Sequence, residues 1–215
     1  MSSNLAQWLD TQRDCTAILM RHAERGHFSH PAAGANVLIT ENGAKEAAQL
    51  GRSLAVARTL DFVHSPVRRC RQTAEAMASG ASELGASARV TGEEGRLGGP
   101  YLLRSTEALN LAGHLGHRFV REWFDGRLPT ELLKPRRDTA LEQIATVQDH
   151  MRRVSRGLVV LVTHDWNLLA VREELFGLRH EDDQWPGFLD GLVFWREHDD
   201  LLVTSRSKVT VIRHV

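Results

Sequence analysis

The sequence predicts an α/β fold, a three-layer α/β/α sandwich with a mostly parallel central sheet and a small helical cap insertion. Short apolar runs alternate along the 215 residues with longer segments of helical pattern, which is typical of a parallel sheet covered by helices. The clearest run, Gly157–Thr163, is apolar almost throughout, as in a strand buried on both faces. Three of the runs end abruptly in polar or charged residues, and ligands bind such sheets at the carboxyl ends of the strands.

The first part of the chain predicts three strands and two helices. Thr16–Met20 is a short apolar run and is expected to form a buried strand. A loop rich in Gly, His, Pro and Ala follows, and Ala44–Leu54 then has the residue pattern of a helix. Asp61–Ser65 is a second strand, which a proline ends. The next helix begins with Arg69–Met77, and Arg89–Thr91 is predicted to be a third strand.

The last part of the chain continues the alternation and closes with a hairpin. Leu141–Val154 has a helical pattern and precedes the buried strand Gly157–Thr163. Asn167–Leu175 is predicted to be the helix that follows this strand. Gly191–Trp195 and Leu201–Thr204 are separated by a polar turn, which favours a closing hairpin.

The segment 96–138 interrupts this regular pattern. Apolar side chains such as Leu115, Phe119 and Trp123 indicate amphipathic helix, while Gly and Pro residues punctuate the segment repeatedly. We therefore predict a single domain over residues 1–215, in which residues 96–138 form a cap over the sheet.

Composition and charge exclude several classes of protein. Lysine plus arginine and aspartate plus glutamate number 27 each, so the formal net charge is zero, which argues against a nucleic-acid binder. No apolar run approaches the roughly 20 residues of a membrane helix, and the first ten residues do not resemble a secretory signal. The sequence therefore predicts a cytoplasmic protein that binds neither membrane nor nucleic acid.

Three predicted strands end in residues that can carry out chemistry. The end of the first strand delivers Arg21 and His22, the second ends at His64 and Ser65, and Gly157–Thr163 leads into His164 and Asp165. Because the carboxyl ends of parallel strands meet at one edge of a sheet, we expect these side chains to lie close together.

These residue types match what a phosphate monoester requires. Arginine donates hydrogen bonds to the non-bridging oxygens in a planar fork, and neutral histidine can act as a nucleophile and form a covalent intermediate. A carboxylic acid can protonate the leaving oxygen. No metal is predicted, because the histidines lack zinc-ligand spacing and the arginines would repel a cation.

The segments that carry these residues resemble those of the histidine phosphatase superfamily, with its phosphoglycerate mutase-like fold. Arg21–Arg25 looks like the RHG signature with Ala23 in place of the usual glycine, and Ser65–Ala74 closely resembles SPxxRxxQTA. Thr163–Leu168 is similar to the HDxNL segment of the acid-phosphatase branch, and Ile39–Gly51 fits the family's LTxxG…LG helix. The matches keep the order of the family and span most of the chain.

The resemblance implies a role for each residue of the site. His22 would be the nucleophile that becomes transiently phosphorylated, and Asp165 would be the proton donor to the leaving oxygen. No cofactor is implied. The groups that would bind the phosphoryl oxygens are Arg21, Arg25, Arg69 and His164.

Two points of the resemblance stay open. Relatives of the phosphoglycerate mutase type draw their acid from a glutamate after the third strand, where Glu93 and Glu94 lie, so either residue is an alternative to Asp165. Ala23 would strain the backbone if its position required positive φ.

The predicted function is a phosphomonoesterase that acts on a small phosphorylated metabolite through a phosphohistidine intermediate. The alternatives are a phosphoryl mutase, a phosphoprotein phosphatase and a non-catalytic module that binds a phosphorylated ligand. We expect specificity to come from the cap and from the loop over residues 26–36. Tyr101, Trp123 and Trp166 are candidates for contact with the substrate.

Overall fold

The computed structural model describes residues 15–56, 59–154, 156–182, 184–205 and 208–212. The amino-terminal stretch, for which the sequence indicates no secretory signal, lies outside these residues. No helix in the described ranges is long and apolar enough to cross a membrane.

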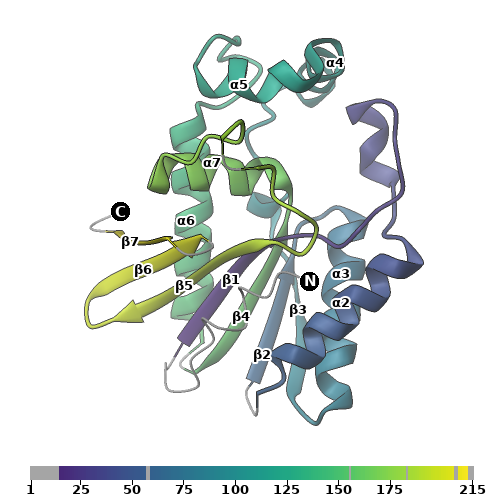
Figure 1. Ribbon diagram of the computed structural model, residues 1–215, viewed down its shortest axis with the longest axis vertical. Coiled ribbons are helices and arrows are strands. Elements are labelled where there is room, and N and C mark those ends of the chain that lie inside the picture. Colours follow the sequence, from purple (N-terminus) through teal and green to yellow (C-terminus); the bar gives the residue numbers. More distant parts are fainter. Residues whose placement is uncertain (1–14, 57–58, 155, 183, 206–207, 213–215) are drawn as a thin grey trace.

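A seven-stranded sheet forms the centre of the molecule (Figure 1), in the order β3-β2-β4-β1-β5-β6-β7. The pairings among β3, β2, β4 and β1 are parallel, whereas those from β1 through β7 are antiparallel. The sheet is therefore mixed, and the predicted parallel arrangement holds for the half that contains the strand ends of interest. The strands are β1 (Cys15–Arg21), β2 (Thr59–His64), β3 (Ser87–Glu93), β4 (Gly157–Thr163), β5 (Gly191–Glu197), β6 (Asp200–Ser205) and β7 (Lys208–Ile212).

Helices cover both faces of the sheet, as the α/β sandwich predicts. Successive side chains of a strand point to opposite faces, and β1 shows this directly. Its Ala17 and Leu19 pack with helices α6 and α7, while Ile18 and Met20 pack with α2 and α3. The helices are α2 (Glu41–Leu54), α3 (Arg68–Glu83), α4 (Ser105–Leu115), α5 (Phe119–Phe124), α6 (Arg136–Arg152) and α7 (Asp165–Phe176).

Two glycines hold α2 close to the rest of the fold. A Cβ atom on Gly51 would overlap the backbone of Met77 in α3, so the glycine permits the close approach of the two helices. A Cβ atom on Gly43 would overlap the backbone of Glu24. The first turn of α2 therefore supports the chain two residues after His22.

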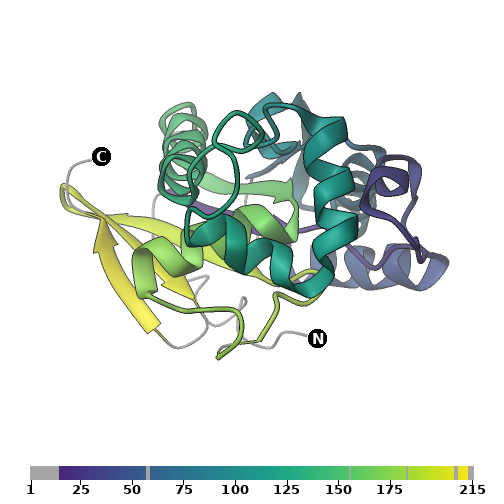
Figure 2. The same cartoon turned by 90° about the horizontal axis from the view of Figure 1, so that it is seen from above.

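The segment 96–138 lies beyond the carboxyl ends of the parallel strands. Its helices α4 and α5 stand at the top of Figure 1, and the view from above in Figure 2 shows them across the strand ends. Helix α4 also contacts the short 3-10 helix η1 (Pro31–Asn36), which follows β1.

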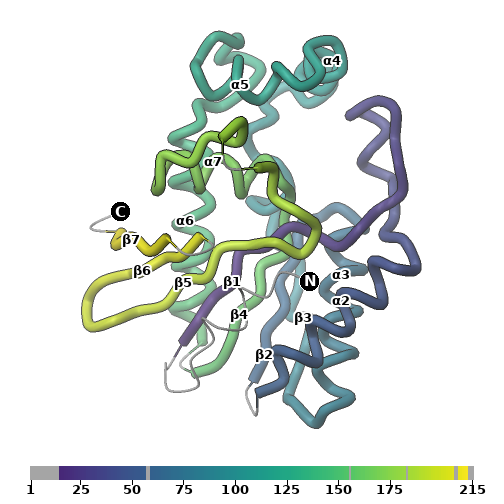
Figure 3. Tube along the Cα trace, viewed as in Figure 1, coloured from purple at the N-terminus to yellow at the C-terminus, as the bar shows by residue number. Residues whose placement is uncertain are grey.

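The connection from α7 to β5 also reaches the strand ends. Figure 3 shows this chain passing beside the end of β1 on its way to β5. The Arg21 amide donates to the Asp190 carbonyl at 2.9 Å, and the Leu189 amide donates to the His22 carbonyl at 3.4 Å. The loop with η1, the segment 96–138 and the α7–β5 connection therefore all lie near the carboxyl ends of the parallel strands.

Candidate active site

The three polar strand ends meet because their strands are neighbours. β4 lies between β1 and β2, and all three run in parallel. The His22 amide donates to the Thr163 carbonyl at 3.0 Å, and the Ser65 amide donates to the Val162 carbonyl at 3.0 Å. The residues that follow the three strands are therefore held together by the sheet's own hydrogen bonds.

His22 is fixed in the form that a nucleophile needs. The side chain is 2% exposed, and its Nδ1 lies 2.8 Å from the carbonyl of Ala23, an acceptor only. Nδ1 must therefore carry the proton, which leaves a lone pair on Nε2. Burial lowers the pKa of His22 well below its ordinary value, and the neighbouring His164 and Arg69 lower it further, so the ring is neutral.

Arg69 lies between the two histidines. Its Nε donates to His22 Nε2 at 2.9 Å, and its Nη2 donates to His164 Nδ1 at 3.1 Å. The remaining terminal nitrogen donates to the carbonyl of Gly34 in η1 at 2.6 Å. The Arg69 guanidinium therefore lies in front of His22 Nε2 and His164 Nδ1, and from this position it can donate hydrogen bonds to a bound anion instead.

His164 is also held as a neutral ring. Its Nδ1 accepts from Arg69, so Nε2 carries the proton and donates to Ser65 Oγ at 2.9 Å. Burial lowers the pKa of His164, and the charge of Arg69 adds to the effect. Ser65 therefore orients His164.

Arg21 and Asp165 form an ion pair on the other side of His22. Arg21 Nη2 lies 2.9 Å from Asp165 Oδ2, and Arg21 Nη1 donates to the carbonyl of Pro186 at 2.6 Å. The guanidinium carbon stands 4.3 Å from the ring centre of Phe188, within the range of a cation–π contact. Arg21 is therefore clamped between the carboxylate and the α7–β5 connection.

Asp165 is ionised in this arrangement. Burial raises its pKa, but the Arg21 charge and the hydrogen bonds from the indole of Trp185 and the Trp166 amide outweigh burial, so the pKa is lowered. Trp185 Nε1 donates to Oδ2 at 3.0 Å, and the Trp166 amide donates to Oδ1 at 3.0 Å. The carboxylate thus lies beside the nucleophile, with a fixed orientation.

These groups line one cavity of about 440 Å³, large enough for a small-molecule ligand. Arg25 also lines it and stacks on Phe28, with 3.8 Å between the guanidinium carbon and the ring centre. The structure therefore brings all the predicted phosphate-binding side chains to a common space. The predicted residues that line this cavity are Arg21, His22, Arg25, Arg69, His164 and Asp165.

Ala23 causes no backbone strain. The non-glycine residues with positive φ in the described chain do not include it. Its methyl group is buried, and its amide donates to Thr73 Oγ1 at 3.0 Å. The position occupied by glycine in the family signature therefore accepts alanine here.

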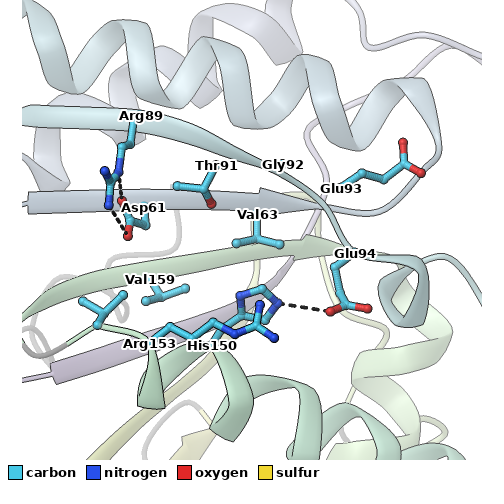
Figure 4. Close-up of a pocket in the computed structure, with 11 residues that line it drawn as sticks. Asp61, Val63, Arg89, Thr91, Gly92, Glu93, Glu94, His150, Arg153 and Val159 are labelled. Carbon is cyan, nitrogen blue, oxygen red and sulfur yellow. Dashed lines mark hydrogen bonds and ion pairs between the residues drawn. The ribbon is translucent and has the colours of Figure 1, made fainter.

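Glu93, the last residue of β3, and Glu94, which follows it, lie at a different cavity, of about 270 Å³ (Figure 4). Glu94 Oε2 lies 2.8 Å from Arg96 Nη2 and 3.2 Å from His150 Nε2, whereas Glu93 points away from His150. Hydrogen bonds from Arg96 lower the pKa of Glu94 to about 2. Neither glutamate lines the cavity around His22.

Two residues of the site were not predicted from the sequence: Trp185 lines the cavity, and the ring centre of Phe188 lies 5.8 Å from that of His22. Trp185 and Phe188 lie on the α7–β5 connection, where a Trp-Pro-Gly-Phe stretch in an otherwise polar loop is the only sequence signal. Of the predicted contact residues, Tyr101 and Trp166 line the cavity. Trp123 does not; it is buried in the core of the cap, where its indole donates to the Lys134 carbonyl.

A comparison with known families identifies the architecture. The family model described as histidine phosphatase superfamily (branch 1) matches residues 17–188. The chain belongs to the histidine phosphatase superfamily. No curated protein matches the sequence.

Solved structures of this superfamily share the fold at low sequence identity. A phosphoglycerate mutase from Bacillus anthracis str. Sterne is 16% identical with a TM-score of 0.60, covering 93% of this chain and 92% of that one. A mycobacterial glucosyl-3-phosphoglycerate phosphatase is 15% identical with a TM-score of 0.56, covering 83% and 89%. A phosphoserine phosphatase from Entamoeba histolytica is 16% identical with a TM-score of 0.58, covering 89% and 95%.

Proposed function

We propose that this member of the superfamily is a phosphomonoesterase that hydrolyses a small phosphorylated substrate through a phosphohistidine on His22. One observation carries the proposal. The unprotonated Nε2 of a buried, neutral histidine faces a cavity in which Arg21, Arg25 and Arg69 supply hydrogen-bond donors. A phosphoryl group needs this combination of an in-line nucleophile and dense positive charge.

In the first step, His22 Nε2 attacks phosphorus and the bond from phosphorus to the ester oxygen breaks. The leaving oxygen takes a proton from Asp165, whose carboxyl group lines the same cavity as His22. In the second step, a water attacks phosphorus while the Asp165 carboxylate takes its proton. The bond from phosphorus to nitrogen then breaks, which restores neutral His22 and releases phosphate.

The arginines and His164 act on the transferring group. As charge spreads over the three non-bridging oxygens, guanidinium donors stabilise the transition state more than water could. Arg69 is positioned for this role because it already contacts both ring nitrogens in the cavity. His164, oriented by Ser65, can donate from Nδ1 to a phosphoryl oxygen once Arg69 turns toward the substrate and this nitrogen takes up a proton beside the anion.

The bound substrate also prepares the acid. Asp165 is ionised while it is paired with Arg21 alone. A phosphate group that shares Arg21 brings negative charge close to the carboxylate, and a like charge raises the pKa of a carboxyl group. The proton required for the first step is therefore taken up with the substrate.

Hydrolysis of p-nitrophenyl phosphate by the purified protein and by His22→Ala tests the proposal. The wild type should turn over the substrate, whereas the variant should lose activity by at least about a thousandfold while keeping its thermal unfolding midpoint within a few degrees. A folded wild-type protein that hydrolyses no phosphate monoester would contradict the proposal, as would full activity of the variant.

A further inference from the structure

The cavity around His22 extends beyond the groups that hold phosphate. We propose that the preferred substrate is a phosphate monoester of an uncharged alcohol that carries an aromatic ring. This inference rests on the proposed function, and it concerns the half of the cavity that receives the leaving group.

The walls of this half are apolar and mainly aromatic. They come from the loop after β1, the segment before α4, α4 itself, the start of α7 and the α7–β5 connection. Aromatic walls favour an aromatic ligand, because flat rings stack or meet edge to face. The side chains are Phe28, Tyr101, Leu102, Leu109, Trp166 and Trp185.

A second cavity of about 230 Å³ adjoins the first. The two share Pro31, Trp166 and Trp185, so the indole rings stand between them. Trp166 is fixed by the core of the cap, with ring centres 5.0 Å from Phe119 and 5.9 Å from Tyr101. The leaving group therefore has room for at least one ring against a rigid aromatic surface.

The distribution of charge excludes an anionic leaving group. Of the arginines that line the first cavity, Arg21 pairs with Asp165 and Arg69 contacts His22, whereas Arg25 stacks on Phe28. His117 is the one titratable side chain among the described residues that line the second cavity. A substrate carboxylate beside the two indole rings would lose water without gaining an arginine partner, which is costly.

One polar group remains available in the apolar half. Tyr101 is 4% exposed, and no hydrogen bond of its hydroxyl was found within the described chain. Burial raises the pKa of this phenol, so it stays a neutral hydrogen-bond donor and acceptor. A neutral oxygen on the substrate fits such a partner, whereas a second charge does not.

Three alkyl phosphates separate the effects of ring and charge. Benzyl phosphate, 4-carboxybenzyl phosphate and glycerol 3-phosphate all release a primary alkoxide, so leaving-group acidity changes little among them. We expect kcat/KM for benzyl phosphate to exceed that for the other two by about tenfold or more, from burial of the ring. Equal values for the three, or a preference for either of the others, would overturn the inference.

A charge placed in the apolar half should reverse the preference. Leu109→Arg adds a cation to the cavity wall, and Asn110→Arg adds the same charge to an exposed position of α4 that does not line it. Leu109→Arg should lower kcat/KM for benzyl phosphate at least tenfold and raise it for 4-carboxybenzyl phosphate. Unchanged preference in folded Leu109→Arg, or the same reversal in Asn110→Arg, would contradict the inference.

Binding of phosphonates tests the inference without turnover. Benzylphosphonate, 4-carboxybenzylphosphonate and methylphosphonate cannot be hydrolysed, and their binding can be followed by the fluorescence of Trp166 and Trp185. Tightest binding of benzylphosphonate supports the aromatic preference even if the protein proves not to be a phosphatase. Equal binding of the three would reject the preference and leave the phosphatase proposal standing if p-nitrophenyl phosphate is hydrolysed.

Discussion

The cavity around His22 and the cavity beside β3 contain the same kinds of residue but balance their charges differently. Beside β3, the buried Asp61 and the half-buried Glu94 already have cationic partners. Arg89 Nε lies 2.6 Å from Asp61 Oδ1, and Glu94 lies between Arg96 and His150. These ion pairs stabilise the fold locally, and charged groups that are already paired with one another have few hydrogen-bond positions left for a ligand.

Around His22 the charges do not balance. Three arginines face a single carboxylate, Asp165, and both histidines are neutral. An excess of donors in a buried space is unfavourable in the empty protein and is relieved by an anion. The two cavities therefore differ more in the balance of their charges than in the number of charged residues, and the unbalanced one is the candidate binding site.

Among variants that keep the nucleophile, the largest expected effect comes from removing a donor from the unbalanced cavity. Arg69→Ala should lower kcat/KM for p-nitrophenyl phosphate by about 100- to 1,000-fold, because Arg69 contacts both histidines and is positioned on the phosphoryl group. Steady-state kinetics and inhibition by inorganic phosphate measure the loss. The matched control is Arg68→Ala, an exposed neighbour that should change kcat/KM less than twofold; equal losses in the two variants would contradict the account.

The single carboxylate of this cavity should matter most for poor leaving groups. Asp165→Asn should lower kcat/KM for benzyl phosphate by about 100-fold and that for p-nitrophenyl phosphate by less than tenfold, because a good leaving group needs less protonation. The ratio of the two kcat/KM values in each protein is the readout. Equal losses on both substrates would point away from Asp165 as the acid.

The dependence of kcat/KM on pH should also reflect the protonation of Asp165. Because the pKa of Asp165 is lowered, the protonated acid becomes scarcer as pH rises, whereas the lowered pKa of His22 keeps the nucleophile neutral in mild acid. The ratio of wild-type to Asp165→Asn kcat/KM for benzyl phosphate should therefore rise as pH falls from about 8 to 5. A ratio that stays constant would contradict this assignment.

The smallest effect on catalysis is expected in the balanced cavity. Glu94→Gln should leave kcat/KM within twofold and lower the free energy of unfolding by about 1–2 kcal/mol, since Arg96 and His150 lose their charged partner. The lowered pKa of Glu94 means that its contribution is present above pH 4–5 and is lost as pH falls toward about 2. A large loss of activity with unchanged stability would instead make Glu94 the acid.

The strand ends were predictable because they follow from local sequence and one topological rule. Gly157–Thr163 is apolar almost throughout, and parallel neighbours bring their carboxyl ends to one edge. The α/β sandwich is confirmed, but only half of the strand pairings are parallel, since those beyond β1 are antiparallel. The strand Lys208–Ile212 was not predicted, although four of its five residues are β-branched; it is short, and most of it is exposed.

The apolar half of the site could not be predicted in the same way. Trp185 contacts Asp165 and Phe188 contacts His22 because the α7–β5 loop passes beside these residues, and no periodic pattern in the sequence predicts the course of a loop. Trp123 and Trp166 look alike in sequence, yet only tertiary packing sends one to the core of the cap and the other to the cavity wall. Ala23 is similar, since the acceptability of its methyl group depends on a backbone angle.

The most direct test of the central claim is to trap the phosphorylated enzyme. Asp165→Asn should form the intermediate from p-nitrophenyl phosphate but hydrolyse it slowly, because the base that activates water is missing. After an alkaline quench, peptide mass spectrometry should find one phosphoryl group, on His22, and none in Asp165→Asn that also carries His22→Ala. Phosphate on another residue, or a burst of p-nitrophenol with no phosphorylated peptide, would contradict the account.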